Sequence, residues 1–335
     1  MENPLVTIAI PTYNRAASYL PQVLKAALNQ TYSNLEIIVS DNCSSDNTPG
    51  LVSAITDPRL RYIRHEVNIG GNNNFNFCIQ QAKGEFFLLL HDDDLIDEDF
   101  IETCIRAANG IPDVGMVRTG MRWIDLNGNV RGSALNRVGG LPVEEFYLGW
   151  FHGKTPMHLC STLFHTQRLR EIGEFRSKHN RFEDVLTEAK LAAKHNRVDV
   201  PEVKASFRHH PEQQAGTGYV DTWCEDSLLL LDTMCALVPA SKSDSFRREA
   251  TKFFIRANYR RARALKSLYW RLNGYATVLK YFNYPIARFT AIAFSLAFSR
   301  FVNATKKFIK KQLERAPALR VRVETLRKDM SGVQH

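Results

Sequence analysis

The chain has 335 residues, of which 44% are hydrophobic and 24% are charged. This composition is ordinary for a soluble globular protein, and the length allows two domains or one large domain with an appendage. No apolar run reaches 18 residues, so a membrane-spanning helix is not expected, and residues 1–4 lack the basic and apolar pattern of a signal peptide.

The net charge of +9 is unevenly distributed along the chain. Residues 240–335 contain 22 Lys and Arg and five Asp and Glu, a net charge of +17, whereas the rest of the chain contains 22 and 30, a net charge of −8. Such asymmetry indicates an anionic partner. The six cysteines form no C-x-x-C pair, which is typical of reduced thiols in a cytosolic protein.

Predicted strands and helices alternate in the first part of the chain. Apolar runs predict strands at residues 5–10, 35–40, 60–64, 86–90 and 114–118. Helices are predicted after Ser18 and over residues 75–82 and 96–108. This alternation predicts an α/β fold with a doubly wound, mostly parallel sheet.

Polar segments follow four of the predicted strands, at residues 11–15, 41–48, 68–74 and 91–94. Ligands of such sheets bind outside the carboxyl ends of the strands, so four polar segments at one edge predict a binding site. The chain has no G-x-G-x-x-G after its first strand and no G-x-x-x-x-G-K-[ST] motif. A dehydrogenase or a P-loop NTPase is therefore not expected.

The strand predicted at 86–90 stops at three carboxylates, Asp92, Asp93 and Asp94. Adjacent carboxylates repel each other, and a divalent cation with oxygen ligands, often shared with a substrate's phosphates, is the usual means of neutralising them. The alternative is a solvated acidic turn that caps the helix predicted at 96–108. The motif alone leaves both interpretations open.

The order of these motifs resembles that of family 2 glycosyltransferases of the GT-A fold, over about residues 5–210. The resemblance rests on Pro-Thr-Tyr-Asn-Arg at 11–15, on Gln-Thr-Tyr-Ser-Asn-Leu-Glu-Ile-Ile-Val at 30–39, on the polar segment that begins at Asp41, and on the acidic strand end. It implies inverting transfer of a sugar from a nucleotide-sugar donor, with a divalent cation, Mn²⁺ or Mg²⁺, on the diphosphate.

The resemblance also implies roles for individual residues. Tyr13 would stack on or flank the donor's base, and Asp41 would accept a hydrogen bond from it. Asp93 would bind the metal, with Asp92 facing the ribose or joining the metal ligands. His91 stands where many members have an aspartate, which leaves the second metal carboxylate open. The predicted donor-binding residues are Pro11, Tyr13, Asp41, Asn68, Asp92, His209 and His210, and one of the two histidines would face the diphosphate.

Glu183 and Asp184 open a helix predicted to run to about Lys194. The family pattern assigns the aspartate as general base, which makes Asp184 the predicted catalytic residue. The alternative role is a helix cap. The two roles are compatible, because a helix N-terminus favours an ionised carboxylate.

A short helix predicted at 143–151 is rich in aromatic residues. Its rings suit stacking on sugar faces, but core packing is the role that its spacing favours.

From about residue 219 the pattern is helical. An apolar stripe is formed by Ala250, Phe253, Phe254, Ala257, Ala264, Leu265 and Leu268. The apolar segment 289–299 is too short to cross a bilayer, and lysines follow it. A basic amphipathic helix can lie in a membrane interface, so the C-terminal region is predicted to bind an anionic membrane surface. Packing on the catalytic domain or on a second subunit is the alternative.

Together these features predict a GT-A catalytic domain at residues 1–215 and a basic helical region at 216–335. The predicted function is inverting, metal-dependent, hexosyltransferase-type transfer from a UDP- or dTDP-sugar to a saccharide or lipid-linked saccharide in surface polysaccharide synthesis, at the inner face of the cell membrane. No nucleic-acid partner is expected. The alternatives are a nucleic-acid-binding protein that uses the basic region, and a non-catalytic glycan-binding relative, against which the intact Asp92-Asp93 and Glu183-Asp184 pairs argue.

Overall fold

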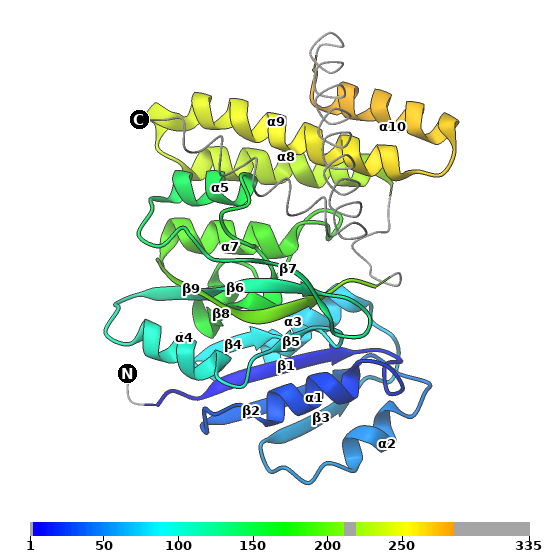
Figure 1. Cartoon of the computed structure of the whole chain (residues 1–335), viewed down its shortest axis with the longest axis vertical. Coiled ribbons are helices and arrows are strands. Elements are labelled where there is room, and N and C mark those ends of the chain that lie inside the picture. The colour runs from blue at the N-terminus through cyan, green and yellow to red at the C-terminus, as the bar shows by residue number, and fades with distance from the viewer. Residues whose placement is uncertain (1–2, 211–218, 285–335) are drawn as a thin grey trace, which may run out of the picture. The chain divides into compact units, whose positions relative to one another are not determined.

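In the computed structural model, which describes residues 3–210 and 219–284, one nine-stranded sheet runs through the protein (Figure 1). The strand order is β3-β2-β1-β4-β8-β6-β9-β5, and β7 pairs with β6. The strands are β1 Val6–Thr12, β2 Leu35–Asp41, β3 Leu60–Arg64, β4 Phe86–Leu89, β5 Leu95–Ile96, β6 Val114–Ile124, β7 Val130–Ala134, β8 Thr162–His165 and β9 Asn196–Arg208. The predicted α/β class is confirmed.

Ten α-helices lie within the described residues. They are α1 Leu20–Leu28, α2 Thr48–Ser53, α3 Gly71–Gln81, α4 Phe100–Ala108, α5 Val143–Phe151, α6 Thr166–Glu171, α7 Glu183–Lys194, α8 Val220–Leu237, α9 Ala240–Ala264 and α10 Leu268–Tyr281. The helix predicted after Ser18 begins at Leu20, with Tyr19 as its N-cap and a proline in its first turn.

The N-terminal half of the sheet is parallel. β2, β1 and β4 lie side by side, with Val6 opposite both Leu35 and Phe86. All residues of β1 and β4 are buried, which explains why both strands are mostly apolar. The second half is mixed, because β8 is antiparallel to β4 and β6, whereas β9 is parallel to β6.

A buried ionic network holds α7 on the second half of the sheet. Arg118 of β6 donates from Nε to Glu188 Oε2 of α7 at 2.7 Å and from Nη1 to Asp199 Oδ1 of β9 at 3.2 Å. All three side chains are fully buried. α5 and α8 pack on α7, so several helices are stacked on this side of the sheet (Figure 1).

The chain divides into two compact units, residues 1–258 and 259–335, and the division falls within α9. Within the first unit, Phe253 and Phe254 of α9 contact the rings of Trp150 and Phe151 of α5. This part of the predicted apolar stripe therefore faces the protein rather than a membrane. The aromatic residues of α5 have the core role that their spacing favours. The domain boundary at residue 215 remains a prediction.

Two other predictions concern membranes and thiols. None of the described helices is both long enough and apolar enough to cross a membrane. The apolar segment 289–299 lies outside the described residues. All six cysteines lie within them, and none forms a disulfide.

Candidate active site

Loops that follow β1, β2 and β4 meet at the carboxyl edge of the parallel half of the sheet. The backbone N–H of Tyr13 donates to Asp92 Oδ2 at 3.3 Å, and that of Asn14 donates to Ser44 Oγ at 2.9 Å. Tyr13 is 46% exposed, so its ring is open to a ligand. The structure thus brings together three of the polar segments that the sequence singled out.

Asp41, at the end of β2, is fully buried. It accepts hydrogen bonds from the backbone N–H of Ser44 at 2.8 Å and from the Tyr62 hydroxyl at 2.5 Å, and Arg64 Nε lies 3.7 Å away. Burial and the Asp41 carboxylate raise the pKa of Tyr62. Any contact between Asp41 and a nucleotide base must add to these bonds or replace one of them.

Asn68 shapes the turn that leads into α3. Its Oδ1 accepts from Asn42 Nδ2 and from the backbone N–H of Gly70, both at 2.9 Å. Gly70 has φ of +86°, in the left-handed region that favours glycine. The N-cap residue of α3 is Gly70, so no side chain caps the N-terminus of this helix.

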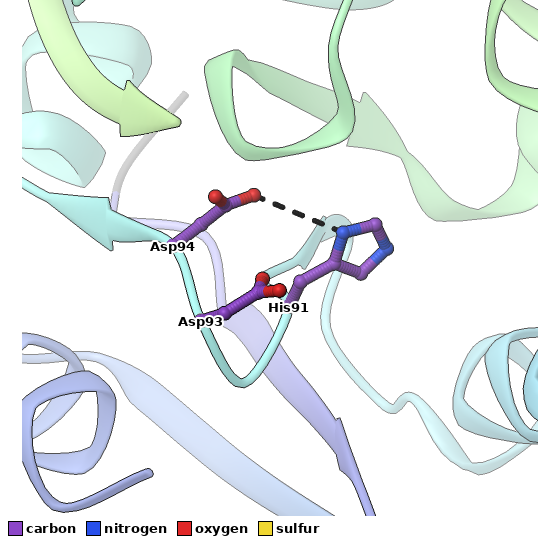
Figure 2. Close-up of side chains that lie close together, drawn as sticks. All are labelled: His91, Asp93 and Asp94. Carbon is purple, nitrogen blue, oxygen red and sulfur yellow. Dashed lines mark ion pairs between the residues drawn. The ribbon is translucent and has the colours of Figure 1, made fainter. Parts of the chain in front are cut away.

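A cluster of possible metal ligands lies in the loop after β4. His91, Asp93 and Asp94 each offer one ligand atom, and these atoms lie within 4.8 Å of one another. Figure 2 shows His91 and Asp94 pointing toward each other, with His91 Nδ1 3.8 Å from Asp94 Oδ2. The sequence left the second metal carboxylate open, with Asp92 as one candidate. Asp92 Oδ2 accepts from the backbone N–H of Tyr13, and Asp92 is not one of the three clustered residues.

The electrostatics of this loop suit a cation. Burial, followed by the charge of Asp93, raises the pKa of Asp94 well above its usual range and that of Asp92 to about 7. Burial lowers the pKa of His91, whose Nε2 is buried without a hydrogen-bond partner among the described residues. Two carboxylates and a neutral imidazole are a donor set that a divalent transition metal such as Mn²⁺ accepts. The residues present therefore fit the divalent cation that the sequence predicted.

The C-terminal end of β9 fixes this loop from the other half of the sheet. Arg208 is fully buried, donates from Nε to the Asp93 carbonyl at 2.8 Å and from its backbone N–H to Asp94 Oδ1 at 3.0 Å. His210 Nε2 lies 2.7 Å from Asp93 Oδ2. From the sequence alone no carboxylate was evident near His209 and His210, and the fold supplies Asp93. His209 is exposed, and its ring contacts Phe207.

Asp184 lies in the first turn of α7. Its Oδ1 accepts from the backbone N–H of Val185 at 2.7 Å. The N-cap residue is Phe182, and no side chain caps the helix, so Asp184 is an acid of the first turn rather than a cap. Burial, followed by the neighbouring charge of Glu183, raises the pKa of Asp184 well above its usual range. A carboxylate with a raised pKa is a better proton acceptor than an ordinary aspartate.

The loop before α7 is held by Asp226 of α8, a residue that the sequence analysis missed. Its buried carboxylate accepts from Ser177 Oγ at 2.7 Å and from the backbone N–H groups of His179 and Arg181, both at 3.0 Å. Glu225 lies beside it and contacts His179 Nε2 at 2.7 Å. No sequence motif marks Asp226, because its partners lie 45 to 49 residues earlier.

A polar cavity of about 270 Å³ separates this loop from the start of α3. Its lining residues are Gly70, Gly71, Asn72, Asn73, Phe75, His179, Asn180, Arg181 and Glu183. Arg181 Nε and Glu183 Oε2 are buried atoms without a hydrogen-bond partner among the described residues. The Phe75 ring lies 5.0 Å from that of His91, so the cavity adjoins the acidic loop.

His158 is a second residue that the sequence analysis passed over. Its ring lies 4.7 Å from that of Phe207. Burial, with smaller effects from His91 and His209, lowers its pKa to about 4. It is therefore a neutral imidazole near the acidic loop at physiological pH.

Comparisons with known proteins give one family. Residues 7–153 match the model of glycosyl transferase family 2. A Campylobacter jejuni GalNAc(5)-diNAcBac-PP-undecaprenol beta-1,3-glucosyltransferase is 31% identical over 176 residues, which are 50% of this chain and 55% of that protein. The Rhizobium meliloti succinoglycan biosynthesis protein ExoO is 36% identical over 106 residues, 32% of this chain and 30% of that protein. The chain thus spans about a third to about half of these relatives.

Two solved structures resemble the fold. Staphylococcus aureus TarS 1–349 in complex with UDP-GlcNAc has a TM-score of 0.58 and 16% identity, and the match covers 83% of this chain and 89% of that one. The Pyrobaculum calidifontis mannosyltransferase PcManGT in complex with GDP-Man and Mn²⁺ has a TM-score of 0.55 and 21% identity, with coverage of 90% and 80%. These likenesses confirm the GT-A-like fold.

Proposed function

From the match of residues 7–153 to the model of glycosyl transferase family 2, we propose that the chain is an inverting, metal-dependent glycosyltransferase. Its donor is a nucleotide sugar, of the UDP or dTDP class. The observation that carries the proposal is the acidic cluster at His91, Asp93 and Asp94, which adjoins a polar cavity bounded on its far side by Glu183, the neighbour of Asp184.

We assign separate roles in binding the donor to the acidic cluster, to Tyr13 and to the residues that line the cavity. His91, Asp93 and Asp94 would hold the divalent cation, which when bound stabilises the negative charge that develops on the departing diphosphate. The half-exposed ring of Tyr13 lies where a base can stack. The cavity takes a sugar ring, whose hydroxyls can pair with Glu183 Oε2 and Arg181 Nε, two buried atoms of its lining that have no hydrogen-bond partner among the described residues.

Asp184 acts as the base in the transfer step. Its carboxylate takes the proton of an acceptor hydroxyl, and the oxygen of that hydroxyl bonds to the anomeric carbon. The bond between that carbon and the diphosphate oxygen breaks on the opposite face, so the configuration inverts. Burial and the charge of Glu183 raise the pKa of Asp184, which makes its carboxylate a stronger base toward that proton.

The acceptor class follows from the relatives. One acts on an undecaprenol diphosphate-linked saccharide, and another is a succinoglycan biosynthesis protein. A saccharide or lipid-linked saccharide of a surface polysaccharide is the acceptor that agrees with both. We further propose that the enzyme acts at the inner face of the cell membrane, where a lipid-linked acceptor is accessible.

Calorimetric titration tests the metal and donor assignments together. UDP and dTDP are titrated with and without Mn²⁺ into the wild type, Asp93→Ala and the control Glu98→Ala, which removes an exposed acid five residues further on. The wild type and the control should bind one nucleotide only with Mn²⁺, and Asp93→Ala should lose that binding while remaining folded. Screening of nucleotide sugars by thermal shift then identifies the donor, because ligand at 100 times its Kd adds about 2.7 kcal/mol.

Two results would contradict the proposal. Unchanged metal-dependent binding in Asp93→Ala would move the metal to other carboxylates. A wild type that no nucleotide sugar stabilises, with or without Mn²⁺, would favour a non-catalytic glycan-binding relative.

A further inference from the structure

The first turn of α10 exposes four large apolar side chains in five residues. Leu268, Tyr269, Trp270 and Leu272 are 68%, 70%, 54% and 57% exposed. Helical spacing puts Leu268, Tyr269 and Leu272 on one face of the helix. A contiguous exposed apolar patch on a folded protein marks an interaction site more often than a single exposed residue does.

Contacts within the second unit fix the orientation of α10 and so keep these four side chains exposed. Ser267 caps α10, its Oγ accepting from the backbone N–H of Trp270 at 3.2 Å. Arg271 Nε donates to the Leu265 carbonyl at 2.6 Å and so fixes the corner between α9 and α10. Another face of α10 buries Gly274 and Val278. The apolar turn is therefore held outward by its own hydrogen bonds and packing.

The charged residues near the exposed apolar patch are all basic. Residues 259–284 contain six Lys and Arg and no Asp or Glu. Of these, Arg260, Lys266 and Lys280 are exposed. The whole second unit, residues 259–335, has 17 basic and three acidic residues, a net charge of +14, whereas the first unit carries −5. The surface is thus complementary to an anionic partner.

We propose that the first turn of α10 inserts into the interface of an anionic lipid membrane. Trp and Tyr side chains favour the headgroup level, leucines favour the acyl chains, and surrounding Lys and Arg contact lipid phosphates, each adding about fivefold to binding. A nucleic acid shares the negative charge, but it gives exposed leucines no apolar surface to enter. This contact surface shares only Leu268 with the apolar stripe that the sequence suggested, and Phe253 and Phe254 of that stripe pack on α5.

Vesicle co-sedimentation of the full chain tests the proposal, and it measures binding rather than sugar transfer. Vesicles contain phosphatidylcholine alone or with about 30% phosphatidylglycerol. The double variant Leu268→Ser, Leu272→Ser is compared with Val130→Ser, which changes an exposed valine of β7 in the first unit. The wild type and the control should partition to the anionic vesicles, and the double variant should partition at least tenfold more weakly.

Fluorescence shows whether the turn itself enters the lipid. Trp270 is more exposed than Trp123, Trp150 and Trp223, so its emission should shift to shorter wavelength on anionic vesicles. Trp270→Phe should bind but lose most of the shift. The proposal is wrong if the double variant binds as the wild type does, if phosphatidylglycerol makes no difference, or if an oligouridylate is bound while the vesicles are not.

Discussion

Replacing Arg118 by methionine tests the link between the sheet and the helix that carries Asp184. Arg118 pairs with Glu188 and Asp199, and its guanidinium lies 4.7 Å from the centre of the Phe146 ring. Glu188 is one helical turn after Asp184. Methionine retains much of the apolar volume but leaves two buried carboxylates with one remaining cation nearby, Arg197, whose Nε is 2.5 Å from Asp199 Oδ2.

The expected loss is large. Removing one partner of a buried ion pair costs about 3–5 kcal/mol. For a domain of about 250 residues, 1 kcal/mol shifts Tm by about 2–4 °C, so Tm should fall by about 6–20 °C. Burial raises the pKa of Glu188, and Arg118 opposes this rise. Without Arg118 the folded state holds more protons than the unfolded state, so the variant should lose stability as pH rises through the raised pKa.

Urea unfolding followed by circular dichroism between pH 5 and 8 measures both effects. The control is Arg247→Met, whose pair with Asp232 is largely exposed, 48% and 64%, and should cost less than about 1 kcal/mol. Adding Glu188→Gln to Arg118→Met removes one stranded charge and should recover part of the loss at pH 8. A loss below about 1 kcal/mol for Arg118→Met, or one that is equal at pH 5 and pH 8, would refute this account of the network.

Two further variants probe the candidate site. Asp184→Asn keeps the shape of the side chain but removes the base, so turnover should fall by about 10² or more while the Kd of the donor is unchanged, and near-normal turnover would leave Asp184 as a structural acid of the first turn of α7. Because the pKa of Asp184 is raised, kcat of the wild type should decline as the pH falls through that pKa, and the residual activity of the variant should lack this decline. Asp226→Ala removes the acceptor for three donors in residues 177–181 and should raise the KM for the sugar substrates without changing metal-dependent nucleotide binding. An unchanged KM would mean that the loop keeps its shape by other contacts.

The parallel half of the sheet could be predicted because its strands carry their own signal. β1, β2 and β4 are buried on both faces, and their apolar runs end at polar loops. In the second half this signal is limited to the start of β6, where a strand was predicted at residues 114–118. β7 is largely exposed, and β9 runs from Asn196 through polar residues because it pairs with β6. Strand structure that depends on a partner is not visible in local periodicity.

The candidate site was likewise predictable only in part. The acidic strand end suggested a metal site, and the family resemblance predicted Asp93 as a metal ligand and Asp184 as the base. Which groups surround Asp93 could not be predicted, because His210 is 117 residues away and reaches it only through the pairing of β9 with β6. The orientation of Asp92 toward the Tyr13 backbone is likewise a property of the turn rather than of the residue types.

The hydrogen bonds between Arg208 of β9 and the acidic loop after β4 have a consequence for the order of folding. The bonds from Arg208 to Asp93 and Asp94 span 115 and 114 residues. During synthesis, β1 to β4 emerge from the ribosome before residue 208 exists, because the chain is made from its N-terminus. The carboxylates therefore reach their final arrangement late, once β9 has joined the sheet and β5 has paired with it. A fragment that ends at residue 153 would contain the whole family match and still lack the groups that shape its acidic loop.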